Sequence, residues 1–199
     1  MQNKSNQPQL ILSSSSPARR ALLARLPIAF LSTSPNVDET PLPGENVKTM
    51  VLRLAELKAR ISAREHDRAL IIGCDQVGTL DDTILCKPLT HQNAVKQLRL
   101  VSGKTVRFFT AICLLDTRNN QIQTAIETYD VHFRELSDAM IESYLRKEQP
   151  YQCAGSFQAE GLGVMLIDKF HGDDYTALIG LPLIRLVQML EKAGVNLLE

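Results

Sequence analysis

Residues 69–76 read ALIIGCDQ, a continuous apolar run that ends in a charged side chain and an amide side chain. A run of this length and composition is typical of a central strand that is covered on both faces of a sheet. In open α/β sheets ligands bind beyond the carboxyl ends of the strands, so Asp75 is a candidate to hold a metal ion or to accept a proton. A turn-forming aspartate is the alternative interpretation.

Strands and helices alternate on both sides of this run. The apolar patterns predict strands over residues 10–12, 28–34, 69–73, 105–115, 122–133 and 164–170. They predict helices over residues 17–26, 47–64, 138–147 and 183–192, and a further helix that Thr90 caps and Gly103 closes. The chain is therefore expected to be an α/β protein whose second half is largely antiparallel.

Charge and composition exclude several classes of partner. The 199 residues include 22 Lys and Arg against 22 Asp and Glu, whereas proteins that bind a nucleic-acid polymer usually carry a basic excess. No apolar run approaches the ~20 residues that span a membrane, and the start of the chain does not resemble a signal peptide. We expect a single domain over residues 1–199 with a polar tail over 1–9, a cytoplasmic location, and four cysteines that are small buried side chains.

A serine-rich turn, residues 13–16, precedes the first predicted helix. Free N–H groups and the helix dipole favour an anion there, and Arg19 and Arg20 follow in the first helical turn. A capped surface helix with solvated arginines is the alternative.

Lys58 falls inside the apolar stripe of the helix predicted over residues 47–64. An ammonium group on a core-facing stripe is costly unless its tip reaches an anion or, as the alternative, extends to water. Lys87 and Glu39 add another cation and another acid in loops. Together with Asp75, these groups suit a phosphate chain that is held with a divalent metal ion.

Seven motifs occur in a characteristic order: LILSSSSPARRALL (10–23), VDET (37–40), LAELKA (54–59), IIGCDQV (71–77), KPLT (87–90), CAGSFQAEG (153–161) and IGLPL (179–183). This order resembles the Maf-like family of nucleotide pyrophosphatases from residue 10 to about residue 193. The resemblance implies a two-lobed, Maf/inosine-triphosphatase-like α/β fold with an elongated mixed sheet, a central cleft and a homodimer. It also implies hydrolysis of a nucleoside triphosphate, a small-molecule substrate, to a monophosphate and pyrophosphate.

The resemblance implies roles for individual residues. Asp75 matches the catalytic aspartate that accepts a proton from the attacking water. The positions that match phosphate-binding residues are Ser14, Arg19, Arg20, Lys58 and Lys87. Glu39 matches an acid that binds a divalent metal cation (Mg, Mn or Co) together with Asp75.

Substrate choice is expected to depend on Gln76, Glu160 and Ala18. Gln76 and the GSFQAEG segment around Glu160 are similar to the branch that hydrolyses 7-methyl-GTP, in which a carboxylate can meet the cationic base. Ala18 departs from that branch, which commonly carries a large aromatic residue there, and Cys86 stands where the family usually has glycine. The alternatives are a dTTP/UTP or broad modified-nucleotide pyrophosphatase, or a nucleotide-binding regulator of cell division with little turnover.

Overall fold

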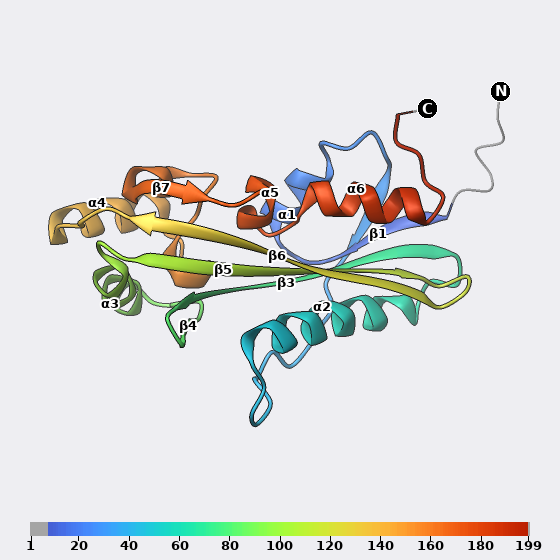
Figure 1. Cartoon of the computed structure of the whole chain (residues 1–199), viewed down its shortest axis with the longest axis horizontal. Coiled ribbons are helices and arrows are strands. Elements are labelled where there is room, and N and C mark those ends of the chain that lie inside the picture. The colour runs from blue at the N-terminus through green and yellow to red at the C-terminus, as the bar shows by residue number, and fades with distance from the viewer. Residues whose placement is uncertain (1–7, 199) are drawn as a thin grey trace. The chain divides into compact units, whose positions relative to one another are not determined.

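A computed structural model of the chain describes residues 8–198, and Figure 1 labels most of its helices and strands. The strands are β1 (Gln9–Ser13), β2 (Phe30–Thr33), β3 (Ala69–Leu80), β4 (Thr83–Leu85), β5 (Thr105–Asp116), β6 (Gln121–Phe133) and β7 (Ile167–His171). The α-helices are α1 (Pro17–Leu23), α2 (Val47–Ala63), α3 (His91–Val101), α4 (Asp138–Glu148), α5 (Tyr175–Ile179) and α6 (Leu183–Lys192). Two short 3-10 helices are η1 (Ala154–Ser156) and η2 (Leu162–Leu166). The α/β prediction is confirmed.

The strands form one mixed sheet in the order β2-β1-β3-β5-β6-β7, with β4 also paired to β3. β1 is parallel to β2 and to β3, whereas the β3–β4 and β6–β7 pairs are antiparallel. The antiparallel β6–β7 pair agrees with the pattern predicted for the second half of the chain.

The chain divides into two compact units. The first unit contains the residues up to 75, residues 110–127 and the residues from 180 onward, and the second contains residues 76–109 and 128–179. The strands β3, β5 and β6 contribute residues to both units. Residues 1–7 of the expected polar tail lie outside the described residues, and Gln9 already belongs to β1.

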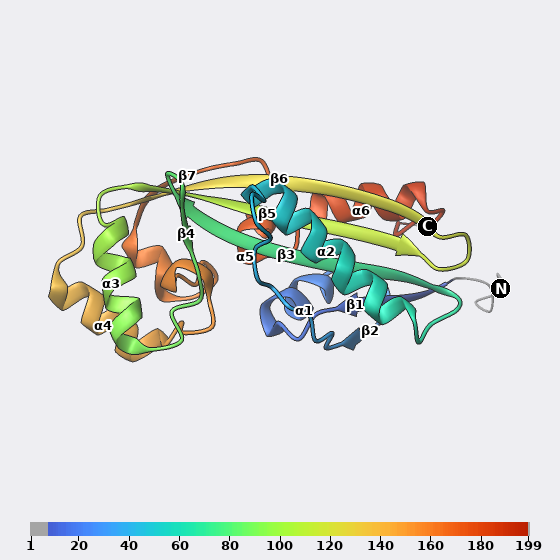
Figure 2. The ribbon, with the colours of Figure 1, turned by 90° about the horizontal axis from the view of Figure 1, so that it is seen from below.

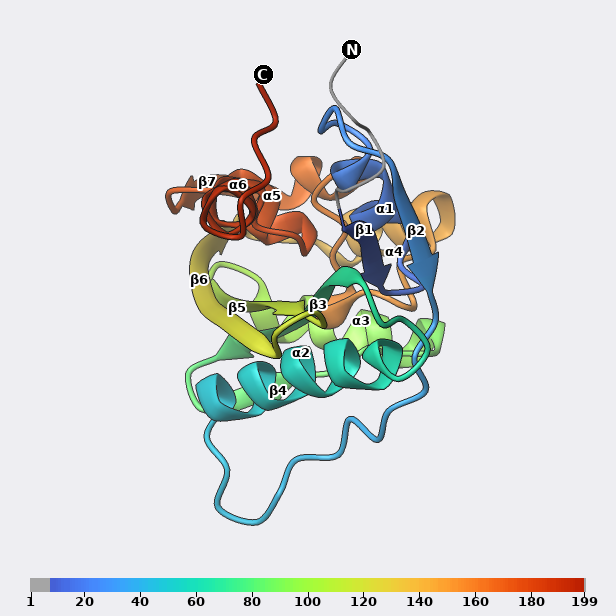
Figure 3. The same cartoon turned by 90° about the vertical axis from the view of Figure 1, so that its right-hand side faces the viewer.

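In the first unit, helices cover both faces of the sheet. α2 lies on one face, and α1 and α6 lie on the opposite face (Figure 3). β1 and the first half of β3 are therefore buried on both sides, and Ile11, Leu12, Ile71 and Ile72 have no exposed surface. α2 begins after Asn46, whose side chain accepts a hydrogen bond from the backbone N–H of Thr49.

The second unit has its own apolar core between its part of the sheet and α3 and α4. Figure 2 shows these two helices side by side. The buried residues of this core come from β3 to β6, from α3 to α5 and from the segment between α4 and β7: Leu80, Leu85, Ala94, Leu98, Val101, Val106, Phe108, Tyr129, Val131, Phe133, Ile141, Tyr144, Leu145, Phe157, Ala159, Leu166 and Leu178.

Several predicted boundaries were wrong. α1 ends at Leu23 rather than at residue 26, because the chain turns there and the N–H of Leu26 bonds to the carbonyl of Leu23. β7 begins at Ile167 rather than at residue 164, because η2 precedes it. The short helix α5 was not predicted. Of the four cysteines, Cys74 and Cys113 are buried as expected and Cys153 is half-buried, but Cys86 is exposed because it lies in the loop after β4.

Within residues 8–198, no helix is long and apolar enough to cross a membrane.

Candidate active site

Asp75 lies inside a strand rather than after one. β3 was expected to end near Gly73, but it continues to Leu80 and forms an antiparallel hairpin with β4. β1 pairs with β3 only as far as Ser13 and Gly73, and the pairing with β4 starts at Gly78. Asp75 therefore lies between these two ladders, where β1 has already ended. The expectation that Asp75 follows the end of its own strand was wrong, and it is the neighbouring strand β1 that ends before this position.

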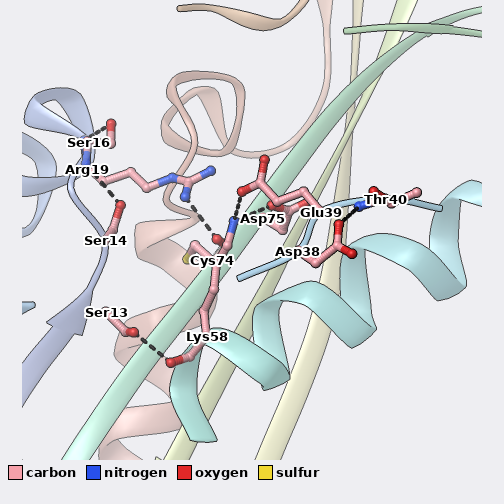
Figure 4. Close-up of polar contacts among 10 residues, drawn as sticks. All are labelled: Ser13, Ser14, Ser16, Arg19, Asp38, Glu39, Thr40, Lys58, Cys74 and Asp75. Atoms are coloured by element: carbon pink, nitrogen blue, oxygen red, sulfur yellow. Dashed lines mark hydrogen bonds and ion pairs between the residues drawn. The ribbon is translucent and has the colours of Figure 1, made fainter. Parts of the chain in front are cut away.

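The carboxylate of Asp75 is paired with Lys58 of α2. Lys58 Nζ donates a hydrogen bond of 2.7 Å to Asp75 Oδ1 and another of 2.7 Å to Glu39 Oε1 (Figure 4). The side chains of Lys58 and Asp75 are only 10% and 8% exposed, whereas Glu39 is 45% exposed. Of the two alternatives for the Lys58 tip, the structure shows contact with an anion, and the ammonium group bridges two carboxylates.

Burial dominates the electrostatics of Asp75. Removal of the carboxyl group from water raises its pKa above the ordinary value, and the charges of Lys58 and Arg19 act in the opposite direction. Glu39 adds to the upward shift. A carboxylate with a raised pKa is a stronger proton acceptor than an exposed one, as general base catalysis near neutral pH requires.

The approach of α2 to β3 places Lys58 beside Asp75. A side chain at Gly73 would collide with the backbone carbonyl of Ala55 and would lie 2.9 Å from the backbone nitrogen of Ala59. The absence of a side chain at Gly73 therefore lets the helix lie directly on the strand. A glycine inside an apolar strand is a known mark of such a close approach, and this signal was overlooked in the sequence.

Hydroxyl groups hold the same turn of α2 against β1 and β2. Ser13 Oγ donates to the carbonyl of Lys58 at 2.7 Å and lies 2.6 Å from Ser62 Oγ, which in turn lies 2.7 Å from Thr33 Oγ1. Ser13 and Ser62 are buried. This chain of hydroxyls could not be predicted from local patterns, because its members come from three separate segments.

The serine-rich turn leads into α1 as predicted. Ser16 caps the helix by accepting a hydrogen bond from the N–H of Arg19, and the N–H of Ser16 donates to Ser14 Oγ at 3.1 Å. The Arg19 guanidinium donates to the carbonyl of Cys74 at 2.9 Å, so it lies next to the strand residue that precedes Asp75 (Figure 4). Arg20 is exposed on the same helix.

Arg53 fixes the loop that carries Glu39. Its guanidinium donates to the Glu45 carboxylate at 2.6 and 2.7 Å and to the carbonyl of Thr40 at 3.2 Å. The hydrogen bonds from Arg53 hold the pKa of Glu45 at about 2. Arg53 was not predicted as a site residue, but it positions the loop that carries Glu39.

Lys87 belongs to the second unit. It is exposed and lies between Cys86 and Pro88, in the segment that leads into α3. Gly103 closes that helix with a φ of +67°, as predicted, and Thr90 caps its start.

Gln76 is engaged by the backbone of α5. Its amide nitrogen donates to the carbonyls of Ala177 and Leu178 at 2.9 and 2.8 Å. Because both partners are acceptors, the nitrogen must face them. Both amide N–H donors are therefore committed in this arrangement, and the expected contact of Gln76 with a base stays a prediction.

The loop that carries Glu160 is anchored by hydrogen bonds at the two residues before it, Gln158 and Ala159. The N–H of Gln158 donates to the Tyr144 hydroxyl at 3.1 Å, and the Tyr175 hydroxyl donates to the carbonyl of Ala159 at 2.9 Å. Desolvation by the surrounding loop raises the pKa of the Glu160 carboxyl group above its ordinary value. Glu160 is thus an acid on a fixed backbone.

The carboxylates of Glu39 and Asp75 supply hard oxygen ligands, which Mg²⁺ and Mn²⁺ prefer. Within the described part of the chain, no three His, Cys, Asp or Glu side chains gather closely enough to hold a metal ion. The donor set therefore fits a cation such as Mg²⁺ that takes one or two carboxylates from the protein and its other ligands from water and substrate phosphates.

Comparison with known proteins agrees with the order of the motifs. The family model described as Maf-like protein matches residues 9–193. The chain belongs to the Maf-like family. This Maf-like protein is 56% identical over 191 residues to the 7-methyl-GTP pyrophosphatase of Methylobacillus flagellatus, across 96% of this chain and 100% of that one. It is 52% identical over 187 residues to the 7-methyl-GTP pyrophosphatase of Nitrosococcus oceani, across 94% of each chain.

Proposed function

We propose that the protein hydrolyses 7-methyl-GTP to 7-methyl-GMP and pyrophosphate. The observation that carries the chemistry is the buried Asp75 carboxylate held by Lys58, since a fixed acid beside a cation suits attack on a phosphate. The substrate is supported by the names of two relatives that match nearly the whole chain at 52% and 56% identity. A cytoplasmic location and a homodimer stay predictions.

Asp75 activates the attacking water. Lys58 holds the carboxylate in place through Oδ1, and the carboxylate accepts a proton from the water. As the proton moves to Asp75, the water oxygen forms a bond to the α-phosphorus and the bond from that phosphorus to the bridging oxygen breaks. Pyrophosphate leaves with the electron pair of that bond, and the other product is the nucleoside monophosphate.

Cationic side chains stabilise the charge that develops on the phosphates. Lys58 and Arg19 lie next to Asp75 in the first unit, and Ser14 and Arg20 belong to the same helix start as Arg19. In this proposal Lys87 binds the triphosphate as well.

A divalent cation would be held by Glu39 and Asp75. When bound, it would neutralise phosphate charge and increase the electrophilicity of the phosphorus. The role of Glu39 depends on the loop that Arg53 anchors through Thr40 and Glu45.

Recognition of the base is assigned to Glu160, whose carboxylate can meet the positive charge of the methylated guanine. Gln76 contributes to the same recognition, either with its amide oxygen or by holding α5.

Hydrolysis in H₂¹⁸O tests the site of attack. The label is expected in 7-methyl-GMP and not in pyrophosphate, as mass spectrometry of the two products would show. Label in pyrophosphate would place the attack on the β-phosphorus and refute the proposed reaction.

A further inference from the structure

Two amide side chains of α3 hold the backbone on both sides of Lys87. Gln97 Nε2 donates to the carbonyl of Cys86 at 2.8 Å, and Asn93 Nδ2 donates to the carbonyl of Pro88 at 3.1 Å. Because the two amides are four residues apart, they lie on the same face of the helix. The segment that follows β4 runs back beside α3 before it enters that helix (Figure 2). The backbone of Lys87 is therefore fixed although its side chain is exposed.

Gln97 makes a second contact, with the loop after α4. Its Oε1 accepts a hydrogen bond of 2.6 Å from Ser156 Oγ. Ser156 has no exposed surface, and both Gly155 and Ser156 have left-handed backbone, with φ of +68° and +58°. The carbonyl acceptor at one end and the hydroxyl at the other fix the orientation of the Gln97 amide. Gln97 thus joins the Lys87 segment to the loop that continues to Glu160.

We propose that Asn93 and Gln97 are positioning residues for Lys87, and that Gln97 couples Lys87 to the loop that carries Glu160. This inference rests on the proposed function, in which Lys87 binds the triphosphate. A lysine side chain loses much conformational freedom when it is held in one place, and a fixed backbone reduces the remaining freedom that binding must remove. The bonds use main-chain carbonyls, so cysteine in place of glycine at position 86 preserves them.

The substitution Gln97→Glu tests the hydrogen bond by which Gln97 holds the backbone beside Lys87. A carboxylate can still accept a hydrogen bond from Ser156, but it cannot donate one to the carbonyl of Cys86. We expect a roughly tenfold loss of kcat/KM for 7-methyl-GTP, the effect of about one hydrogen bond. Gln92→Glu is the matched control, because Gln92 is exposed on the same helix and the charge change is identical. The control is expected to keep the wild-type kcat/KM.

A double-mutant cycle with Lys87→Ala separates positioning from general damage to the fold. If Gln97 acts through Lys87, the double variant has nearly the kcat/KM of Lys87→Ala alone. If the two losses multiply, Gln97 does not act through Lys87 and the inference is overturned. Should Gln97→Glu fail to fold, as judged from its thermal unfolding, Asn93→Ala replaces it in the same cycle, because Asn93 is exposed and holds the other carbonyl.

The kcat/KM of the wild type for 7-methyl-GTP separates a failure of the proposed function from a failure of the inference about Gln97. A wild type that does not hydrolyse 7-methyl-GTP rejects the proposed function and, with it, this inference. A wild type that does hydrolyse it, in combination with multiplicative losses in the cycle, rejects only the inference.

Discussion

Lys58 Nζ and Asp75 Oδ1 lie 2.7 Å apart, and both side chains are almost completely buried. A buried ion pair of this kind costs desolvation energy, and other residues keep it in place. Ser13 bonds to the backbone of Lys58, and Gly73 lets α2 lie on β3. The pair is thus a consequence of how the helix packs on the strand.

Asp75→Asn is expected to abolish turnover. Asparagine has the same size and can still accept a hydrogen bond from Lys58, so the fold and nucleotide binding are retained. The proton acceptor is lost, and kcat should fall roughly 10²- to 10⁴-fold, the usual contribution of a general base. Pyrophosphate release measures turnover, and calorimetric titration measures binding.

Asp81→Asn is the matched control, because Asp81 lies in the exposed turn after the same strand and its φ of +50° suits asparagine. It should leave kcat unchanged. Turnover near the wild-type level in Asp75→Asn would eliminate Asp75 as the base.

Gly73→Ala is expected to destabilise the protein and to slow catalysis. The new methyl group would meet the backbone of α2 at Ala55 and Ala59, which can yield only by moving the helix. Overpacking of this kind costs about 1–3 kcal/mol of the free energy of unfolding, which urea denaturation measures.

Gly78→Ala in the same strand is the comparison. Its methyl group would meet the ring of Phe108 at 3.0 Å, a side chain that can shift slightly. Equal losses of unfolding free energy and of kcat in the two variants would show that the helix approach at Gly73 has no special role.

Much of the first unit follows from local patterns in the sequence. The apolar run at 69–72, the serine cap of α1 and the apolar stripe of α2 each depend on neighbouring residues, and each of the three elements begins where its pattern predicted. The buried position of Lys58 was foreseen for the same reason.

The length of β3 and the partner of Lys58 could not be predicted from local patterns in the sequence. Polar residues after Gly73 are typical of a strand end, but Asp75 is tolerated inside the strand because Lys58 neutralises it across the packed interface. Contacts such as Ser156 with Gln97, which are 59 positions apart, also depend on tertiary packing.

The ion pair between Glu45 and Arg53 is expected to stabilise the protein only above acidic pH. Arg53 lowers the pKa of Glu45 from the ordinary value of 4.5 to about 2. A carboxyl group whose pKa is lower in the folded state stabilises that state above its unfolded pKa, and this stability is lost as the pH falls toward the folded pKa. The difference in Tm between wild type and Glu45→Gln should therefore be present at pH 6 and shrink between pH 4.5 and about 2. A difference that stayed constant over this range would show that charge is not its cause.

Ala18→Trp places a large aromatic side chain on α1 at the position where the 7-methyl-GTP branch commonly carries one. Ala18 is half-buried in the first turn of that helix. A cation–π contact with the methylated base contributes about 1 kcal/mol, so KM for 7-methyl-GTP should fall about fivefold while KM for GTP changes little. An unchanged ratio of the two KM values would mean that no stacking is made from this position.

Substrate preference tests most directly the central claim, that the protein hydrolyses 7-methyl-GTP. The measurement is pyrophosphate release by the purified protein from 7-methyl-GTP, GTP, dTTP and UTP, each with Mg²⁺, Mn²⁺ or Co²⁺. We predict that kcat/KM is highest for 7-methyl-GTP, by roughly tenfold or more if one charge-assisted contact distinguishes the methylated base. A kcat/KM for 7-methyl-GTP no greater than that for GTP, dTTP or UTP would contradict it.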